Sequence, residues 1–97
     1  METKSISEGD KLTIAVSGRV DTVTAPELEA GLKLGDAKFV VIDLANVPYM
    51  SSAGLRLLLT VHKTMLGRGG EFQVANVQSA VREVLDITGF SDILSLV

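Results

Sequence analysis

The stretch Val47-Pro48-Tyr49-Met50-Ser51-Ser52-Ala53-Gly54-Leu55 joins a strand-like run to a helix-like run and decides how this chain folds. Pro48 interrupts the extended pattern, two hydroxyls stand where a helix begins, and Gly54 keeps the first helical turn free of bulk. Serine is a favoured N-cap because its oxygen accepts an orphan backbone N–H. A phosphate suits the same position, since exposed N–H groups and the helix dipole favour negative charge. Ser51 and Ser52 are therefore either helix caps, which spacing alone favours, or a phosphorylatable switch.

The segments on either side of this stretch predict a buried strand and an amphipathic helix. Residues 39–44 are nearly all apolar, which is typical of a parallel strand covered on both faces. A helix is expected from about Ala53 to Leu66. Helical spacing places an inward stripe at Leu55, Leu58, Leu59, His62 and Leu66. The outer face is expected to carry Arg56, Leu57, Thr60, Lys63 and Thr64.

The first part of the chain predicts a hairpin followed by a helix. Residues 12–17 alternate apolar and polar side chains, and residues 8–11 supply a turn, so residues 3–7 are expected to pair with them. Thr24 and Glu27 have the spacing of a capping box, which predicts the start of a helix.

The last third predicts three more elements. Residues 71–75 alternate as a strand, residues 79–86 form a short helix, and residues 91–97 form a last helix or strand. The whole pattern predicts the α/β class, as a single domain over residues 1–97. We expect a mixed sheet of four to five strands with an N-terminal hairpin, covered by about four helices.

Composition narrows the class of protein. The chain has 97 residues, of which 46% are hydrophobic, enough for one core. A net charge of −3 argues against nucleic acid or an anionic membrane as a partner. The absence of cysteine excludes disulfides and thiolate chemistry. Because the sequence has neither a signal-peptide core nor an apolar run of membrane length, we expect a soluble cytoplasmic protein.

The residues do not support an enzyme, a cofactor or a metal site. Ser-x-x-Gly at 51–54 is not the Gly-x-Ser-x-Gly nucleophile elbow. The single histidine, His62, is about two to three helical turns from Ser52, too far to act as its base, and is expected to be half-buried and structural. One histidine without cysteine gives no metal-ligand set. Residues 67–70 lack the spacing of a phosphate loop.

Polar residues gather where the predicted strands end. Asp21, Asp43, Ser51, Ser52 and Asn76 fall at or just after the carboxyl ends of strands. In open α/β sheets this edge is where ligands and partners bind. Asp21 has an alternative interpretation as a turn residue that caps the next helix.

Three segments together resemble a known family: Val-Asp-Thr-Val-Thr-Ala-Pro at 20–26, Ile-Asp-Leu at 42–44 and Tyr-Met-Ser-Ser-Ala-Gly-Leu at 49–55. Gly-Gly before a strand at 69–70 and Asp-Ile-Thr-Gly-Phe at 86–90 extend the likeness. Over nearly its whole length the chain resembles the STAS domain of bacterial anti-sigma factor antagonists. The resemblance implies a protein without enzymatic activity, which binds an anti-sigma factor and so releases a sigma factor.

The resemblance also implies how such a protein is switched. The anti-sigma factor is a serine kinase that phosphorylates the antagonist and lowers its affinity, and a PP2C-type phosphatase reverses the modification. Ser52 matches the phosphorylated serine of the family. Ser51 stands where many kinase-regulated members have Asp, and it remains an alternative acceptor. The expected partner-binding residues are Asp21, Thr22, Asp43, Ser51, Ser52, Arg56, Leu57 and Thr60.

Because Ser51 stands where many kinase-regulated members have Asp, a second function stays open. STAS domains also serve as constitutive partner-binding subunits, in stressosome-like scaffolds or lipid-transport complexes, without regulation by phosphorylation. For either function we expect no direct contact with nucleic acid or membrane. We expect a monomer or a weak dimer, because the free edge of the N-terminal hairpin is short and polar.

Overall fold

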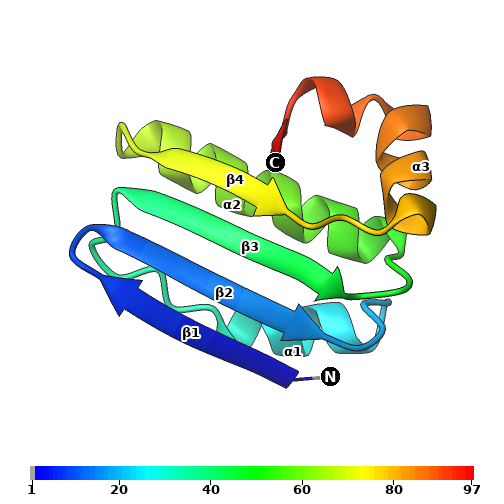
Figure 1. Ribbon diagram of the computed structural model, residues 1–97, viewed down its shortest axis with the longest axis horizontal. Helices are drawn as coiled ribbons and strands as arrows, with labels where there is room; N and C mark the ends of the chain where they lie inside the picture. The colour runs from blue at the N-terminus through cyan, green and yellow to red at the C-terminus, as the bar shows by residue number, and fades with distance from the viewer. Residues whose placement is uncertain (1) are drawn as a thin grey trace.

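The computed structural model describes residues 2–97, so Met1, the first residue of the expected domain, lies outside the described residues. Over residues 2–97 the chain forms five strands, three α-helices and one 3-10 helix (Figure 1). The strands are β1 (Glu2–Glu8), β2 (Lys11–Ser17), β3 (Phe39–Asn46), β4 (Glu71–Ala75) and β5 (Ser95–Leu96). The helices are α1 (Thr24–Gly31), α2 (Ser52–Gly67), α3 (Ser79–Thr88) and the 3-10 helix η1 (Phe90–Asp92). The predicted α/β class is confirmed.

The five strands form one mixed sheet in the order β1-β2-β3-β4-β5. β1 and β2 are the predicted antiparallel hairpin, and the other neighbouring pairs are parallel. Parallel neighbours need crossover connections, which are almost always right-handed. Because each crossover steps to the next strand in the same direction, the connecting helices gather on one face. Figure 1 shows α1 and α2 together behind the strands.

The prediction that β3 is covered on both faces is wrong. Val40, Ile42 and Leu44 point into the core and are 0%, 1% and 0% exposed. The alternate residues Val41 and Asp43 lie on the face that carries neither α1 nor α2 (Figure 1). Val41 is buried but lies outside the main core cluster, with β2 and β4 on either side of it. A central strand therefore carries a nearly continuous apolar run without helices on both faces.

The bounds of α2 agree with the prediction, but its buried face does not. The buried residues of α2 are Gly54, Leu55, Leu57, Leu58, Val61 and Met65. Leu57, expected on the outer face, is 5% exposed, whereas Leu66, expected in the core, is 63% exposed. Leu59 and His62 are half-buried. The physical reason is that α2 packs against α1 as well as the sheet, so its buried arc is wide and extends toward α1.

The C-terminal third follows the predicted order of elements. Val81 and Leu85 of α3 are buried, and Val84 packs against the same core. Gly89 ends α3 in the left-handed conformation, with φ of 81°, which glycine adopts at little steric cost. The final segment, expected as either helix or strand, contains both, because η1 is followed by β5 paired with β4.

Candidate functional site

Hydrogen bonds join the loop after β2 to the loop after β3. The amide of Val20 donates to the carbonyl oxygen of Tyr49 at 3.0 Å, and the amide of Ser51 donates back to the carbonyl oxygen of Val20 at 2.8 Å. Val20 and Met50 thus form an isolated parallel bridge beyond the ends of the two strands. This bridge places the start of α2 beside the segment that leads into α1.

Gly54 allows α2 to begin close to this bridge. A Cβ atom at position 54 would lie 2.5 Å from Cγ of Met50 and 2.9 Å from Cγ1 of Val20. Both of these side chains are buried and have little room to move away. The prediction that Gly54 keeps the first turn free of bulk is confirmed, and the bulk that it avoids belongs to the bridge.

The two serines at the start of α2 have different surroundings. Ser51 occupies the N-cap position with an extended backbone, but its side chain makes no capping hydrogen bond. The Ser51 Oγ is buried without a hydrogen-bond partner, so the prediction of a hydroxyl cap is wrong for Ser51. Ser52 is the first residue of the helix, and it is exposed. Of the two hydroxyl-bearing residues, Ser52 is therefore the accessible one.

The start of α2 is electrostatically suited to an anion. The first amides of a helix lack intrahelical partners, and the helix dipole adds partial positive charge at this end. The first turn of α2 contains no acidic residue that would already neutralise this field. A phosphate attached to Ser52 would therefore meet a favourable field in the free protein.

Asp21 acts as the cap of α1 in this structure. Its Oδ1 accepts hydrogen bonds from the amides of Val23 at 2.9 Å and Thr24 at 3.0 Å, and Thr24 Oγ1 accepts one from the Asp21 amide at 2.9 Å. The capping pair is thus Asp21 with Thr24, and the predicted pair of Thr24 with Glu27 is wrong. The bonds from the Thr24 and Val23 amides lower the pKa of the Asp21 carboxyl below its ordinary value. Asp21 therefore carries negative charge at neutral pH, next to the bridge.

Arg19 and Tyr49 are residues of this site that the sequence did not reveal. Arg19 Nε lies 3.3 Å from Asp21 Oδ2, and its guanidinium carbon lies 4.1 Å from the centroid of the Tyr49 ring. The bridge that brings them together joins segments about thirty residues apart, and no local pattern encodes it. The one available signal was an aromatic residue, Tyr49, two positions before the first of two adjacent serines. We call Arg19, Asp21, Tyr49 and Ser52 the Ser52 surface.

The helix residues predicted to bind a partner divide into exposed and buried positions. Arg56 and Thr60 are exposed on α2, and Thr22 is exposed in the turn after Asp21. Arg56 and Thr60 line a shallow groove of about 240 Å³ between α1 and α2. Leu57 borders the same groove but is buried, so its predicted role as an exposed contact is wrong. The exposed residues extend the accessible surface from Ser52 along α2.

Asp43 and Asn76 are not part of the Ser52 surface. Asp43 is half-buried on the face of the sheet opposite α2, and its Oδ1 accepts a 2.9 Å hydrogen bond from the Ala45 amide. Asn76 follows β4 with φ of 56°, and its amide donates to the carbonyl oxygen of Val97 at 3.2 Å. Asn76 thus follows the end of β4, whereas Asp43 lies inside β3, which continues to Asn46.

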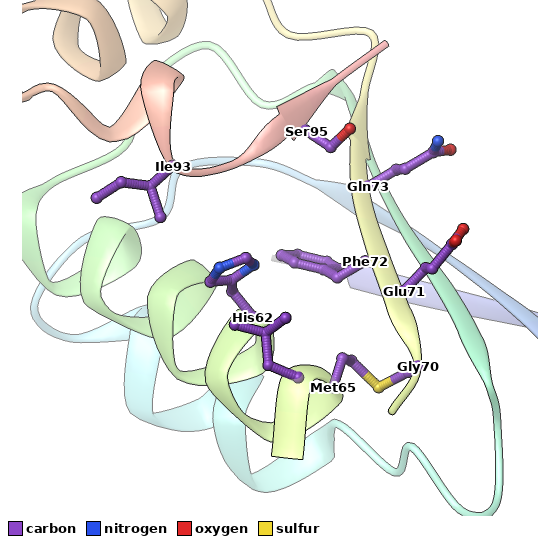
Figure 2. Close-up of a pocket in the computed structure, with 9 residues that line it drawn as sticks. His62, Met65, Gly70, Glu71, Phe72, Gln73, Ile93 and Ser95 are labelled. Atoms are coloured by element: carbon purple, nitrogen blue, oxygen red, sulfur yellow. The ribbon is translucent and has the colours of Figure 1, made fainter. Parts of the chain in front are cut away.

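The hollow at the other edge of the sheet is separate from the Ser52 surface. A pocket of about 310 Å³ lies between α2, β4 and the C-terminal segment. Figure 2 shows His62 and Phe72 among the side chains that line it. His62 is half-buried there, as predicted. Among residues 2–97 no three His, Cys, Asp or Glu side chains are grouped to hold a metal ion. No helix within this part of the chain is long and apolar enough to cross a bilayer.

Comparisons with known proteins give the same family as the motifs. A family model described as the STAS domain matches residues 3–97. BtrV of Bordetella bronchiseptica is 38% identical over 84% of this chain and 73% of its own length. The anti-sigma-B factor antagonist of Listeria monocytogenes is 31% identical over 90% of this chain and 79% of its own length. The crystal structure of an anti-sigma factor antagonist from Mycobacterium paratuberculosis superposes with a TM-score of 0.86, covering 98% of this chain and 83% of that chain at 28% identity.

The order of strands, the bridged loops before α2 and the family model that spans residues 3–97 lead to one conclusion. The chain belongs to the STAS domain family.

Proposed function

We propose that this domain is an anti-sigma factor antagonist that is switched by phosphorylation of Ser52. In its unmodified form it binds an anti-sigma factor that is also a serine kinase, and so releases a sigma factor. The observation that carries the proposal is the contrast between the two serines. Ser52 is exposed at the first position of α2, whereas the Ser51 hydroxyl is buried. Relatives named as anti-sigma factor antagonists support the choice of partner.

The docking surface of the proposal is the Ser52 surface together with the exposed residues of α2 that follow it. Tyr49 is 42% exposed and presents an aromatic ring beside a cation and a carboxylate. Aromatic and Arg side chains are enriched among residues that dominate binding energy at interfaces. Arg56 and Thr60 continue this surface along the groove between α2 and α1. Asp43 has no place in this surface, because it lies on the other face of the sheet.

Phosphorylation acts on the interface and leaves the fold intact. A phosphate adds about −1.5 to −2 charges at neutral pH. In the free protein the start of α2 tolerates this charge. In the complex the phosphate must lose water, close to the charged Asp21, so docking becomes unfavourable. A PP2C-type phosphatase that removes the group restores the binding form.

The proposal is tested by binding of an anti-sigma factor kinase to the wild type, Ser52→Asp and Ser52→Ala, with isothermal titration calorimetry as the readout. Ser52→Asp is expected to weaken binding by at least about tenfold, or about 1.4 kcal/mol. Ser52→Ala should bind within about threefold of the wild type, because it adds no charge. The thermal midpoints of all three should agree closely. Equal affinity of Ser52→Asp and wild type, or unfolding of Ser52→Asp, would contradict the proposal.

A further inference from the structure

β1 is a free edge without a bulge or a proline, although three of its seven residues are charged. All seven of its residues, Glu2–Glu8, are exposed, and its outer side has no strand partner in residues 2–97. Its pairing with β2 runs without a register shift, so no bulge turns the edge away. It contains no proline, and its only lysine is Lys4. Natural proteins often protect such edges with bulges, prolines or charged side chains, and an edge that no bulge or proline interrupts is a template for a strand whose charges complement its own.

The side chains of β1 form a short pattern of charge and hydrophobicity on one face. Lys4, Ile6 and Glu8 alternate along the strand and share the face that α1 and α2 leave uncovered. Ile6 is 61% exposed. The salt bridges in residues 2–97 join Arg19 with Asp21 and Arg82 with Asp86, so Lys4 and Glu8 belong to none of them.

We propose that two copies of this chain associate through antiparallel pairing of their β1 strands, centred on Ile6. In this register Ile6 lies opposite Ile6 of the second copy, and Lys4 lies opposite Glu8 in both directions. Two-fold symmetry makes each contact occur twice. Opposite charges and apolar pairs directly across two strands stabilise the pairing. The two sheets then form one continuous sheet.

The neighbouring symmetric registers lack this complementarity. The two-fold axis requires residues of the same face to oppose one another, so the register shifts in steps of two residues. Centring on Ser5 places Glu2 opposite Glu8 twice, and centring on Lys4 places two lysines opposite each other. Centring on Ser7 places Ile6 opposite Glu8. Like charges directly across strands are destabilising, so the sequence of β1 selects the register centred on Ile6.

The proposed dimer is weak and leaves the Ser52 surface free. About five residues of each copy pair, far fewer than the roughly 20–30 residues on each side of a standard interface. We therefore expect a dissociation constant between about 10 μM and 1 mM. In Figure 1 the end of β1 that contains Glu8 lies at the opposite end of the sheet from the point where β3 leads toward α2. The inference does not depend on the proposed function.

Charge exchange in the whole chain tests the register by sedimentation equilibrium at low salt. Lys4→Glu alone and Glu8→Lys alone each oppose like charges, so each should weaken the dimer at least tenfold. An equimolar mixture of the two variants restores both opposite-charge pairs, and should dimerise within about threefold of the wild type. Lys63→Glu on α2 makes the same charge change as Lys4→Glu and should have no effect. A wild type that stays monomeric at 1 mM, or a mixture that stays monomeric, would overturn the inference.

A cysteine pair gives a second measurement that does not alter charge. The chain has no cysteine, so a single introduced cysteine can form a disulfide only between copies. Residues opposite each other in antiparallel strands have Cα atoms about 4.5–5.5 Å apart, within disulfide range. Ile6→Cys should therefore cross-link rapidly under mild oxidation. Thr3→Cys, whose two copies are six residues out of register, should not. Equal cross-linking of the two variants would contradict the proposed pairing.

Discussion

The amide of Ser51 donates a 2.8 Å hydrogen bond to the carbonyl oxygen of Val20 and so joins the start of α2 to the loop before α1. The residue that follows Val20 is Asp21, and the residue that follows Ser51 is Ser52. The backbone hydrogen bonds of this bridge therefore link the cap of one helix to the candidate phosphorylation site on the other. Packing at this bridge is expected to control the geometry of the site.

Gly54→Ala should destabilise the domain. Alanine normally stabilises a helix relative to glycine by about 1 kcal/mol, but here its Cβ would collide with the buried side chains of Met50 and Val20. Overpacking of this kind costs about 1–3 kcal/mol. Gly67→Ala, at the end of the same helix with open space around it, is the control and should be neutral or stabilising. Urea unfolding of both variants measures the difference, and equal stability of the two would contradict the role assigned to Gly54.

Ser51→Ala should not follow the usual behaviour of an N-cap. Loss of a capping serine typically costs about 1 kcal/mol, but the buried Oγ of Ser51 has no hydrogen bond to lose. We expect Ser51→Ala to be within about 0.5 kcal/mol of the wild type, or more stable. Thr24→Ala removes the hydrogen bonds that Thr24 Oγ1 makes with the Asp21 amide and the Arg19 carbonyl oxygen. This variant should lower the free energy of unfolding by about 1 kcal/mol. A larger loss for Ser51→Ala than for Thr24→Ala in the same unfolding assay would refute this assignment.

Asp21→Asn should reduce the dependence of stability on pH. Because the folded-state pKa of Asp21 is lowered, its charge stabilises the fold above about pH 4, and this contribution disappears as pH falls through the folded pKa. The wild type should therefore melt at a higher temperature than Asp21→Asn at pH 7. The gap in melting temperature should shrink as the pH is lowered toward 2. A gap that stays constant over this range would show that the Asp21 charge does not contribute.

Leu57→Ala and Leu66→Ala test which face of α2 is buried. Leu57 is 5% exposed and packs at the junction of α2 with α1, so its truncation should cost about 2–5 kcal/mol. Leu66 is 63% exposed, and its truncation should change the free energy of unfolding by less than about 0.5 kcal/mol. The opposite order of these two costs in chemical denaturation would restore the stripe predicted from the sequence.

These cases show which parts of the fold are encoded locally. Alternation, helical spacing and glycines predicted the order and type of the elements, because those signals act within a few residues. The buried face of α2 was misassigned at Leu57 and Leu66, because it depends on how α1 docks. The helix-free face at Val41 also follows from the order of strands across the whole sheet.

The same distinction applies to the candidate site. The sequence placed Ser51, Ser52 and Asp21 at one edge, and the structure joins their segments through the bridge. The sequence did not show that Ser52 is accessible and that the Ser51 hydroxyl is buried, because this difference depends on how the side chains are oriented. Arg19 was missed because its contacts with Asp21 and Tyr49 exist only after the two loops are paired. The sequence grouped Asp43 with the site because Asp43 falls near the carboxyl end of a predicted strand, and that criterion does not consider on which face of the sheet its side chain lies.

The most direct measurement is the intact mass of the domain after incubation with Mg-ATP and each kinase-type anti-sigma factor encoded in the same genome. The wild type and Ser51→Ala should each gain one phosphate, and Ser52→Ala should gain none, because the Ser52 residue is exposed while the Ser51 hydroxyl is buried. A phosphate that persists in Ser52→Ala would contradict the choice of residue. Stable binding to such a factor without any mass gain would contradict the switch and indicate a constitutive partner-binding domain.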